Sequence, residues 1–183
     1  MNLGVDLTAC WRPRVGMVTV GIELTRELLA AAPEGTSLTL FCSRERPAEF
    51  ASSDAPVVLS PWRHEVANKL RWLPAVEGEA GLDVMLYPYW PSPPRRRPGA
   101  PPAAVFVHDL AFRVRPDEVP WQQRIYMGSI LGPSLRQAAA VITPSEATRR
   151  DLLLHYPVHG LEERTRVVPE GRSLDRVEPG ALP

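Results

Sequence analysis

The stretch Val105-Phe106-Val107-His108-Asp109-Leu110 decides the fold class of this 183-residue chain. Its apolar residues come directly before the polar pair His108 and Asp109, and a short apolar run of this length is typical of a parallel strand buried on both faces. Ligands bind at the carboxyl ends of strands in an open parallel sheet. The sequence therefore predicts a binding site at His108 and Asp109. From these two residues alone, a polar pair that only caps the following turn is the simpler interpretation.

Segments with the apolar patterns of strands and helices alternate along nearly the whole chain. The expected strands are residues 3–7, 37–42, 56–60, 82–87, 103–107, 140–143 and 166–171. The expected helices are residues 17–32, 65–76 and 121–139, and a further helix opens within 144–152. This alternation predicts an α/β fold with a mostly parallel sheet of about six or seven strands, covered by helices on both faces.

The apolar periodicity of the first two long helices also predicts which side of each faces the core. In the first helix the residues on one face are Val20, Leu24, Leu28 and Leu29. In the second helix they are Val66, Leu70 and Leu73. We expect these two faces to be the buried ones, because residues three and four apart lie on the same side of a helix.

Three motifs together resemble those of a known family. They are the strand ending in His108-Asp109, the Ser145-Glu146 pair that opens a helix containing Arg149-Arg150-Asp151-Leu152, and the strand that ends in Pro169-Glu170-Gly171. In this order and at this spacing they resemble the amino-terminal domain of family 4 retaining glycosyltransferases, which have the GT-B fold. The resemblance covers nearly the whole chain and is closest from Asp83 to Gly171.

The resemblance implies an organisation and an activity. Residues 1–171 are expected to form a Rossmann-like three-layer domain, half of a GT-B fold, and residues 172–183 to begin a linker to a second domain that this sequence lacks. Such a domain supplies the acceptor side of an enzyme that moves a sugar from a nucleoside-diphosphate sugar to a hydroxyl of a carbohydrate or glycoconjugate. No metal and no other cofactor are expected. The donor-binding domain is expected in cis or in trans, so the chain alone should be inactive.

The same resemblance assigns catalytic roles to His108 and Asp109. The matching histidine of the family lies against the donor sugar and contacts a hydroxyl near the reacting carbon, and Asp109 would orient the loop or the ring. A neutral imidazole can donate or accept a hydrogen bond near pH 7, which suits this role. We expect the His108 ring to be partly accessible and free of a core hydrogen-bond network. A core histidine is the alternative.

The loop before the first helix is a candidate phosphate site. A helix amino terminus there can bind a phosphate through free backbone N–H groups, and Gly16 and Met17 stand at that position. The family usually has two small residues in this loop, whereas Val15-Gly16-Met17 contains one glycine. A glycine that only permits a turn is an equal alternative. No Gly-x-Gly-x-x-Gly motif or P-loop lysine is found.

Aromatic and basic residues follow the strand at 82–87. Tyr89 and Trp90 are candidate acceptor-binding residues, because aromatic rings pack against the C–H faces of sugars; packing within their own loop is the alternative. The run Arg95-Arg96-Arg97 would suit an anionic acceptor or a peripheral membrane contact, but a solvated loop is the commoner role of such a run. Glu170 replaces the asparagine of the family motif, whose amide contacts are therefore lost.

Composition excludes several classes of protein. The chain has 21 basic and 21 acidic residues, so no nucleic-acid partner is indicated. Cys10 and Cys42 are too few for a disulfide framework, and the start of the sequence lacks a signal peptide, so we expect a cytoplasmic protein. His155 and His159 have the spacing of a zinc pair, but Pro157 breaks the helix that would hold them.

Two further functions remain open at this stage. One is a GT-B sugar epimerase, which would place different acid and base groups in the cleft. The other is a non-enzymatic scaffold subunit that pairs with a separate catalytic chain. The donor sugar, the acceptor and the oligomeric state are not indicated by the sequence.

Overall fold

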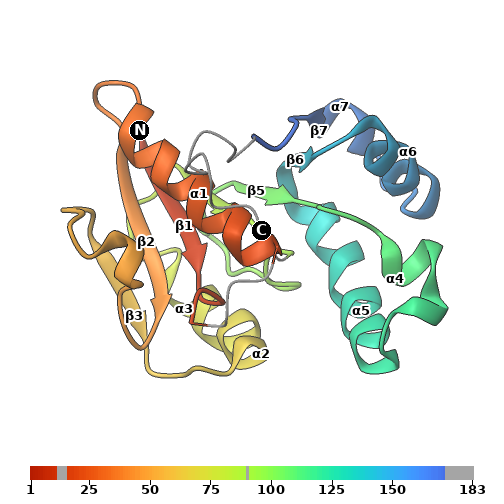
Figure 1. The fold of residues 1–183 in the computed structure, drawn as a ribbon, viewed down its shortest axis with the longest axis horizontal. Coiled ribbons are helices and arrows are strands. Elements are labelled where there is room, and N and C mark those ends of the chain that lie inside the picture. Colours follow the sequence, from red (N-terminus) through yellow and green to blue (C-terminus); the bar gives the residue numbers. More distant parts are fainter. Residues whose placement is uncertain (12–15, 90, 172–183) are drawn as a thin grey trace, which may run out of the picture.

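The computed structural model describes residues 1–11, 16–89 and 91–171. Seven strands of this part form one sheet in the order β3-β2-β1-β4-β5-β6-β7, and all neighbours are parallel (Figure 1). The strands are β1 (Asn2–Leu7), β2 (Ser37–Ser43), β3 (Val57–Ser60), β4 (Val84–Tyr87), β5 (Ala103–Phe106), β6 (Ala138–Thr143) and β7 (Thr165–Val167). The predicted α/β class with a parallel sheet of six or seven strands is confirmed.

Helices or 3₁₀ turns lie between most strands that are consecutive in the chain, whereas the described residues between β4 and β5 form no helix. The α-helices are α1 (Gly16–Ala31), α2 (Glu65–Ala67), α3 (Leu73–Val76), α4 (Ala111–Val114), α5 (Trp121–Gln137), α6 (Glu146–His155) and α7 (Leu161–Arg164). A π-helical turn, η2 (Asn68–Trp72), joins α2 to α3, and the 3₁₀ turns are η1 (Ala48–Phe50) and η3 (Pro116–Glu118).

Two hydrophobic cores lie on opposite faces of the sheet. Strand residues that alternate along β4 divide between them: Met85 and Tyr87 belong to one core, and Leu86 to the other. The first core also takes Leu73 of α3 and Leu135 of α5. The second core takes Val18 and Ile22 of α1, which crosses β1 and β2 in Figure 1. This arrangement is the three-layer, Rossmann-like fold that was expected.

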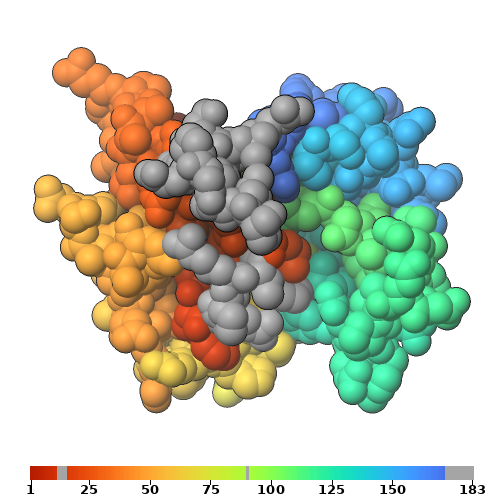
Figure 2. Space-filling model, in the orientation of Figure 1, coloured from red at the N-terminus to blue at the C-terminus, as the bar shows by residue number. Residues whose placement is uncertain are grey.

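The two halves of the sequence occupy different sides of the molecule. In the space-filling view, the N-terminal half (red to yellow) and the C-terminal half (green to blue) pack side by side (Figure 2). The strand order reverses between β1, which pairs with β2, and β4, which pairs with β5. Ligands of open α/β sheets bind at such a reversal, outside the carboxyl ends of the strands. The fold therefore directs attention to the loops that follow β1, β4 and β5.

The predicted face of α1 meets the core only at its edge. Its most buried residues are Val18, Gly21, Ile22 and Thr25, whereas Leu24, Leu28 and Leu29 are only partly buried at the edge of the core. A Cβ added to Gly21 would lie 2.6 Å from the ring of Tyr89. The helix therefore packs closely through small residues, and its leucines lie to the side of the contact.

The predicted buried face of residues 65–76 is wrong in part. Leu70 is 46% exposed, whereas Asn68, Lys69, Trp72 and Leu73 are buried. Two polar residues replace leucine at the contact because they find buried partners: Asn68 donates to Ser43 Oγ at 2.8 Å, and Lys69 pairs with an aspartate. Apolar periodicity cannot detect such a face.

Candidate functional site

A pocket opens at the carboxyl edge of the sheet, where the fold places ligands. Its volume is about 130 Å³. Its lining includes Met17 from the start of α1, Tyr89 after β4, and His108 and Asp109 after β5. Segments that are far apart in sequence thus bring four of the six predicted site residues to one cavity. Of the other two, Gly16 does not line the pocket, and Trp90 lies outside the described residues.

His108 is held at both ring nitrogens. Nε2 lies 2.7 Å from the carbonyl oxygen of Pro88, and Nδ1 lies 2.9 Å from Oε1 of Glu170. The ring is stacked on Phe106 with centroids 4.4 Å apart and 19° between the planes. A carbonyl oxygen only accepts, so Nε2 carries a proton and donates it to Pro88. The carboxyl ends of β4, β5 and β7 are thereby joined through one imidazole.

The His108 ring is hydrogen-bonded and only slightly accessible. Only 10% of the His108 side chain is exposed, and both nitrogens are in use. Its partners nevertheless belong to the loops after β4 and β7 and not to either core. His108 also lines the pocket. The residue is thus fixed in place at the mouth of a cavity, and its catalytic role remains a prediction.

Glu170 is the residue that the sequence analysis missed. At Pro169-Glu170-Gly171 the sequence alone indicates only the loss of an amide contact. In the structure the longer, charged side chain reaches across β6 to His108, and 38% of it is exposed. The signal was present in the sequence as an acidic residue shortly after a strand that ends at the same edge as His108.

Asp109 fixes the turn after His108. Its Oδ1 accepts a hydrogen bond from the backbone N–H of Ala111 at 2.8 Å, which closes an Asx turn at the start of α4. Thr148 of α6 donates its hydroxyl to the carbonyl oxygen of His108 at 3.3 Å. The predicted role of Asp109 in orienting the loop agrees with this geometry, whereas direct participation in catalysis stays a prediction.

Gly16 and Met17 begin α1 on the opposite side of the site. Gly16 is exposed, and a Cβ added to it would meet nothing within 4 Å, so packing within the described residues does not require glycine there. Met17 is half-buried and lines the pocket. Residues 12–15, which complete the predicted phosphate loop, lie outside the described residues. The phosphate-binding role of Gly16 and Met17 stays a prediction.

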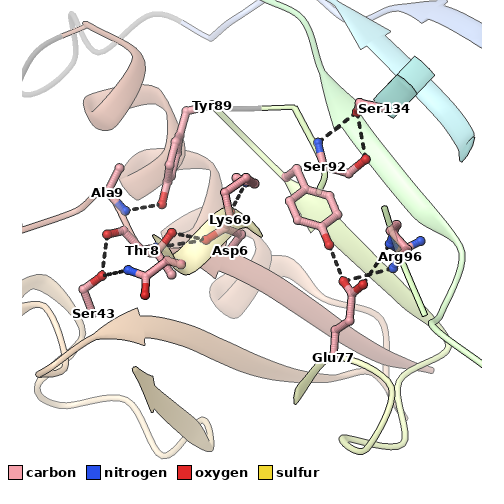
Figure 3. A network of polar contacts seen from close by, with 12 residues as sticks. Asp6, Thr8, Ala9, Ser43, Lys69, Glu77, Tyr89, Ser92, Arg96 and Ser134 are labelled. Carbon is pink, nitrogen blue, oxygen red and sulfur yellow. Dashed lines mark hydrogen bonds and ion pairs between the residues drawn. The ribbon is translucent and has the colours of Figure 1, made fainter. Parts of the chain in front are cut away.

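Tyr89 is buried beneath the pocket. Its hydroxyl oxygen accepts a hydrogen bond from the backbone N–H of Ala9 at 2.8 Å, and its ring packs on Gly21 (Figure 3). Burial, and then the nearby charge of Asp6, raise the pKa of Tyr89 well above its usual value. Tyr89 therefore presents its ring to the cavity with its hydroxyl already engaged. Its acceptor-binding role stays a prediction.

Two buried ion pairs lie beside the Tyr87 ring (Figure 3). Lys69 Nζ lies 2.7 Å from Asp6 Oδ2, and each side chain is 1% exposed. The Lys69 ammonium also lies 4.7 Å from the centre of the Tyr87 ring. The Tyr87 hydroxyl donates to Glu77, and burial followed by the charge of Glu77 raises the pKa of Tyr87 well above its usual value.

Arg96 completes the second pair and corrects the interpretation of the arginine run. Its Nε lies 3.0 Å from Glu77 Oε1, and only 7% of its side chain is exposed. Arg95 and Arg97 are exposed. Arg96 is therefore not part of a solvated loop or an open anion site, because Glu77 already neutralises it. Arg96, the middle residue of the run, is buried because it pairs with the buried Glu77 carboxylate.

Other nucleophiles and metal ligands contribute little here. Both cysteines are free thiols; burial raises the pKa of Cys42 to about 12 and that of Cys10 further. A thiol of this kind is a poor nucleophile, because the thiolate is the reactive form. No three metal-ligating side chains come together within the described residues. None of the described helices is long and apolar enough to cross a bilayer.

Comparison with known proteins identifies the family. The sequence model described as Glycosyltransferase Family 4 matches residues 15–176, which is most of the chain. A search of curated proteins found no match. The matched range includes the pocket and the motifs at His108, Ser145 and Glu170. With its parallel sheet and a pocket at the carboxyl edge, the chain belongs to glycosyltransferase family 4.

Proposed function

We propose that this chain supplies the acceptor side of a retaining, metal-independent glycosyltransferase, which moves a hexose from a nucleoside-diphosphate sugar to an acceptor hydroxyl. The observation that carries the proposal is the pocket that joins Met17, Tyr89, His108 and Asp109 in a family 4 domain. In the reaction, the acceptor oxygen bonds to the anomeric carbon and the bond to the diphosphate breaks. The diphosphate departs with the electron pair and takes up the acceptor proton.

The charge of the pocket supports a division of labour between two domains. Among its described lining residues there is no lysine or arginine. A departing diphosphate needs positioned positive groups or N–H donors. We therefore assign the diphosphate to a second, donor-binding domain, present in cis or in trans, and the acceptor to this pocket. On this view the 183-residue chain alone turns over no sugar nucleotide and binds one weakly.

The hydrogen bonds of His108 suggest how it meets a substrate. Nε2 is bound to Pro88 on its buried side, whereas the Glu170 carboxylate is partly exposed. A sugar hydroxyl therefore meets the imidazole through Nδ1 and Glu170, which act as one unit. An exchange of the Glu170 contact for a substrate hydroxyl leaves the ring held by Pro88 and by its stacking on Phe106.

A scaffold subunit is the second candidate function, and one observation favours it. The polar groups of His108 and Tyr89 that face this site all have partners within the chain. In a scaffold subunit, His108 and Tyr89 would only join the ends of strands and would contact no substrate. We also propose a cytoplasmic location, which two free thiols support.

Sugar transfer to a panel of acceptors tests the proposal directly. It is measured for the chain alone and with the donor-binding domain supplied, fused or as a separate protein. Turnover that needs both parts, and that His108→Ala lowers by about 10²-fold or more, supports the transferase. Unchanged turnover in His108→Ala, with a loss of thermal stability, favours the scaffold. Tight binding of a nucleotide sugar by the chain alone contradicts the division of labour.

A further inference from the structure

The pocket beside His108 has an apolar interior. Phe106, Phe112 and Leu131 are buried core residues that also form its walls. Met17 and Met127 close it from the two flanking helices, α1 and α5. Methionine fills and adapts to irregular apolar shapes, so these two side chains suit a cavity that receives a ligand. The interior thus resembles the core from which it is built.

Polar side chains in the lining of the pocket are few. They are those of His108, Asp109 and Gln123, because the Tyr89 hydroxyl is already bound to Ala9. A sugar ring carries hydroxyls around its whole rim. Burial of a hydroxyl without a partner costs about 2 kcal/mol or more. The cavity is therefore unsuited to a buried sugar ring and suited to an apolar group.

The size of the cavity narrows the class of ligand. Its volume of about 130 Å³ is close to that of an engineered apolar cavity of about 150 Å³ that binds benzene. One phenyl ring, or a short branched alkyl group, fills such a space. A polar substituent on that group meets His108, whose ring lies on Phe106 and so stands at the border between apolar wall and polar mouth.

We infer that this pocket binds an apolar group about the size of one aromatic ring, carried by an acceptor alcohol whose hydroxyl lies against His108 and Glu170. The role of this alcohol as a sugar acceptor rests on the proposed function, whereas its binding to the pocket does not. The acceptors of this enzyme are accordingly aromatic or compact apolar alcohols and glycoconjugates that carry such a group.

The methionines provide a direct test. The chain has four, of which Met17 and Met127 line the pocket, whereas Met85 is fully buried in the core beneath the sheet and Met1 is exposed. The protein with ¹³C-methyl methionine is titrated with 2-phenylethanol and followed by NMR. We expect saturable shifts of the Met17 and Met127 methyls with little change at Met85. Glucose at the same concentrations should leave the methyl shifts of all four methionines unchanged.

Matched variants assign the shifts to the pocket. Val119→Phe fills it, since Val119 is half-buried in its lining, and should weaken binding of 2-phenylethanol about tenfold or more. Val114→Phe makes the same change at an exposed position outside the lining and should leave binding unchanged. Should Val119→Phe fail to fold, Ala111→Leu narrows the same pocket. Equal binding by all variants, or the absence of selective methyl shifts, overturns the inference.

The titration contains no sugar nucleotide, so its result is separate from that of the transfer assay. Selective shifts without transfer to any acceptor would leave the pocket assignment standing and contradict the proposed function. Transfer to polar acceptors without methyl shifts would support the proposed function and contradict the pocket assignment. Transfer that prefers 2-phenylethanol to glucose, and that Val119→Phe reduces about tenfold, supports both.

Discussion

At the scale of single residues, the structure contains charged side chains that are buried as oppositely charged pairs. Lys69, the single lysine of the sequence, is buried against Asp6, and Arg96 is buried against Glu77. Such pairs are not strong stabilisers relative to apolar residues, but removal of one partner leaves an uncompensated buried charge. Surface pairs lack this property because water replaces the lost partner. The two classes should therefore respond very differently to mutation.

Lys69→Met tests this difference. It leaves Asp6 buried with its remaining hydrogen bonds from Thr8, and we expect a loss of about 3–5 kcal/mol in the free energy of unfolding. Arg63→Met is the matched control, because it removes an exposed partner of Glu45 and should cost under about 1 kcal/mol. Urea midpoints at constant m value measure both. Similar small losses in the two variants would contradict the buried-pair argument.

Glu170 is expected to act as a positioning residue for His108. Glu170→Ala removes the partner of Nδ1, so the ring can turn about its bond to Pro88, and we expect turnover of the domain-complete enzyme to fall about tenfold. Glu170→Gln still offers an amide that can pair with Nδ1 in either protonation state and should recover most of that loss. A purely structural role predicts that melting temperature changes and turnover does not.

The control for Glu170 is a carboxylate in a different setting. Glu162→Ala removes an exposed partner of Arg149 outside the pocket lining and should leave turnover unchanged. The ¹⁵N shifts of the His108 ring give a second measurement, since they report the protonation and hydrogen bonding of each nitrogen. Ring shifts that are identical in Glu170→Ala and the parent chain would show that the contact is absent in solution.

At the scale of elements, helix α1 shows why a helix packs through its smallest residue. Gly21 faces the ring of Tyr89, whose hydroxyl is bound to Ala9 and whose ring has little room to move. Glycine in a helix interior costs about 0.5–1 kcal/mol relative to alanine. Glycine stands here despite this cost, because only a residue without a Cβ lets α1 approach the Tyr89 ring so closely.

Gly21→Ala should therefore destabilise the protein although alanine favours the helix. The added Cβ would lie 2.6 Å from a ring carbon of Tyr89, and overpacking of this kind costs about 1–3 kcal/mol. Gly128→Ala in α5 is the control: its added Cβ meets only the Arg113 guanidinium at 3.6 Å, so we expect a gain of about 0.5–1 kcal/mol. Thermal unfolding should move in opposite directions for the two variants. A shift in the same direction would contradict the packing argument.

At the scale of the whole molecule, burial of the two cysteine thiols makes the protein less stable at alkaline pH. Burial raises the pKa of Cys42 from 9.0 to about 12, and that of Cys10 also rises. Above about pH 9 the unfolded chain loses these thiol protons while the native chain keeps them. The unfolded state then binds fewer protons, so the free energy of unfolding falls as pH rises. Below about pH 9 both states are protonated and this effect vanishes.

Unfolding free energies at pH 7, 9 and 10.5 measure the expected loss. Each fully titrating thiol contributes at most about 1.4 kcal/mol per pH unit. Cys42→Ala removes one such group, so its stability should decline less steeply than that of the parent chain over the same interval. Ser52→Ala, at an exposed position without a thiol, is a control that should keep the parent slope. Identical slopes for the parent and Cys42→Ala would contradict the assignment.

The sequence by itself determined the features that depend on near neighbours. Buried strands and the helices between them follow from local apolar patterns, which is why the α/β fold and the strands were predicted within a few residues. The cap of α6 is equally local: Ser145 Oγ accepts from the backbone N–H of Thr148, three residues on, at 3.1 Å. His108 was singled out because a strand end places a side chain at the edge of any parallel sheet.

Only the tertiary structure decided the partners of the buried polar groups. Glu170 meets His108 across 62 residues of sequence, Lys69 meets Asp6 across 63, and Arg96 meets Glu77 across 19. No local pattern distinguishes these residues from solvated ones, since their burial depends on a partner that the folded sheet delivers. The same reason explains where the helix faces differ from the predicted ones: Lys69 and Gly21 lie inward and Leu70 outward. Contacts at long range gave the pocket its fixed histidine and its apolar walls.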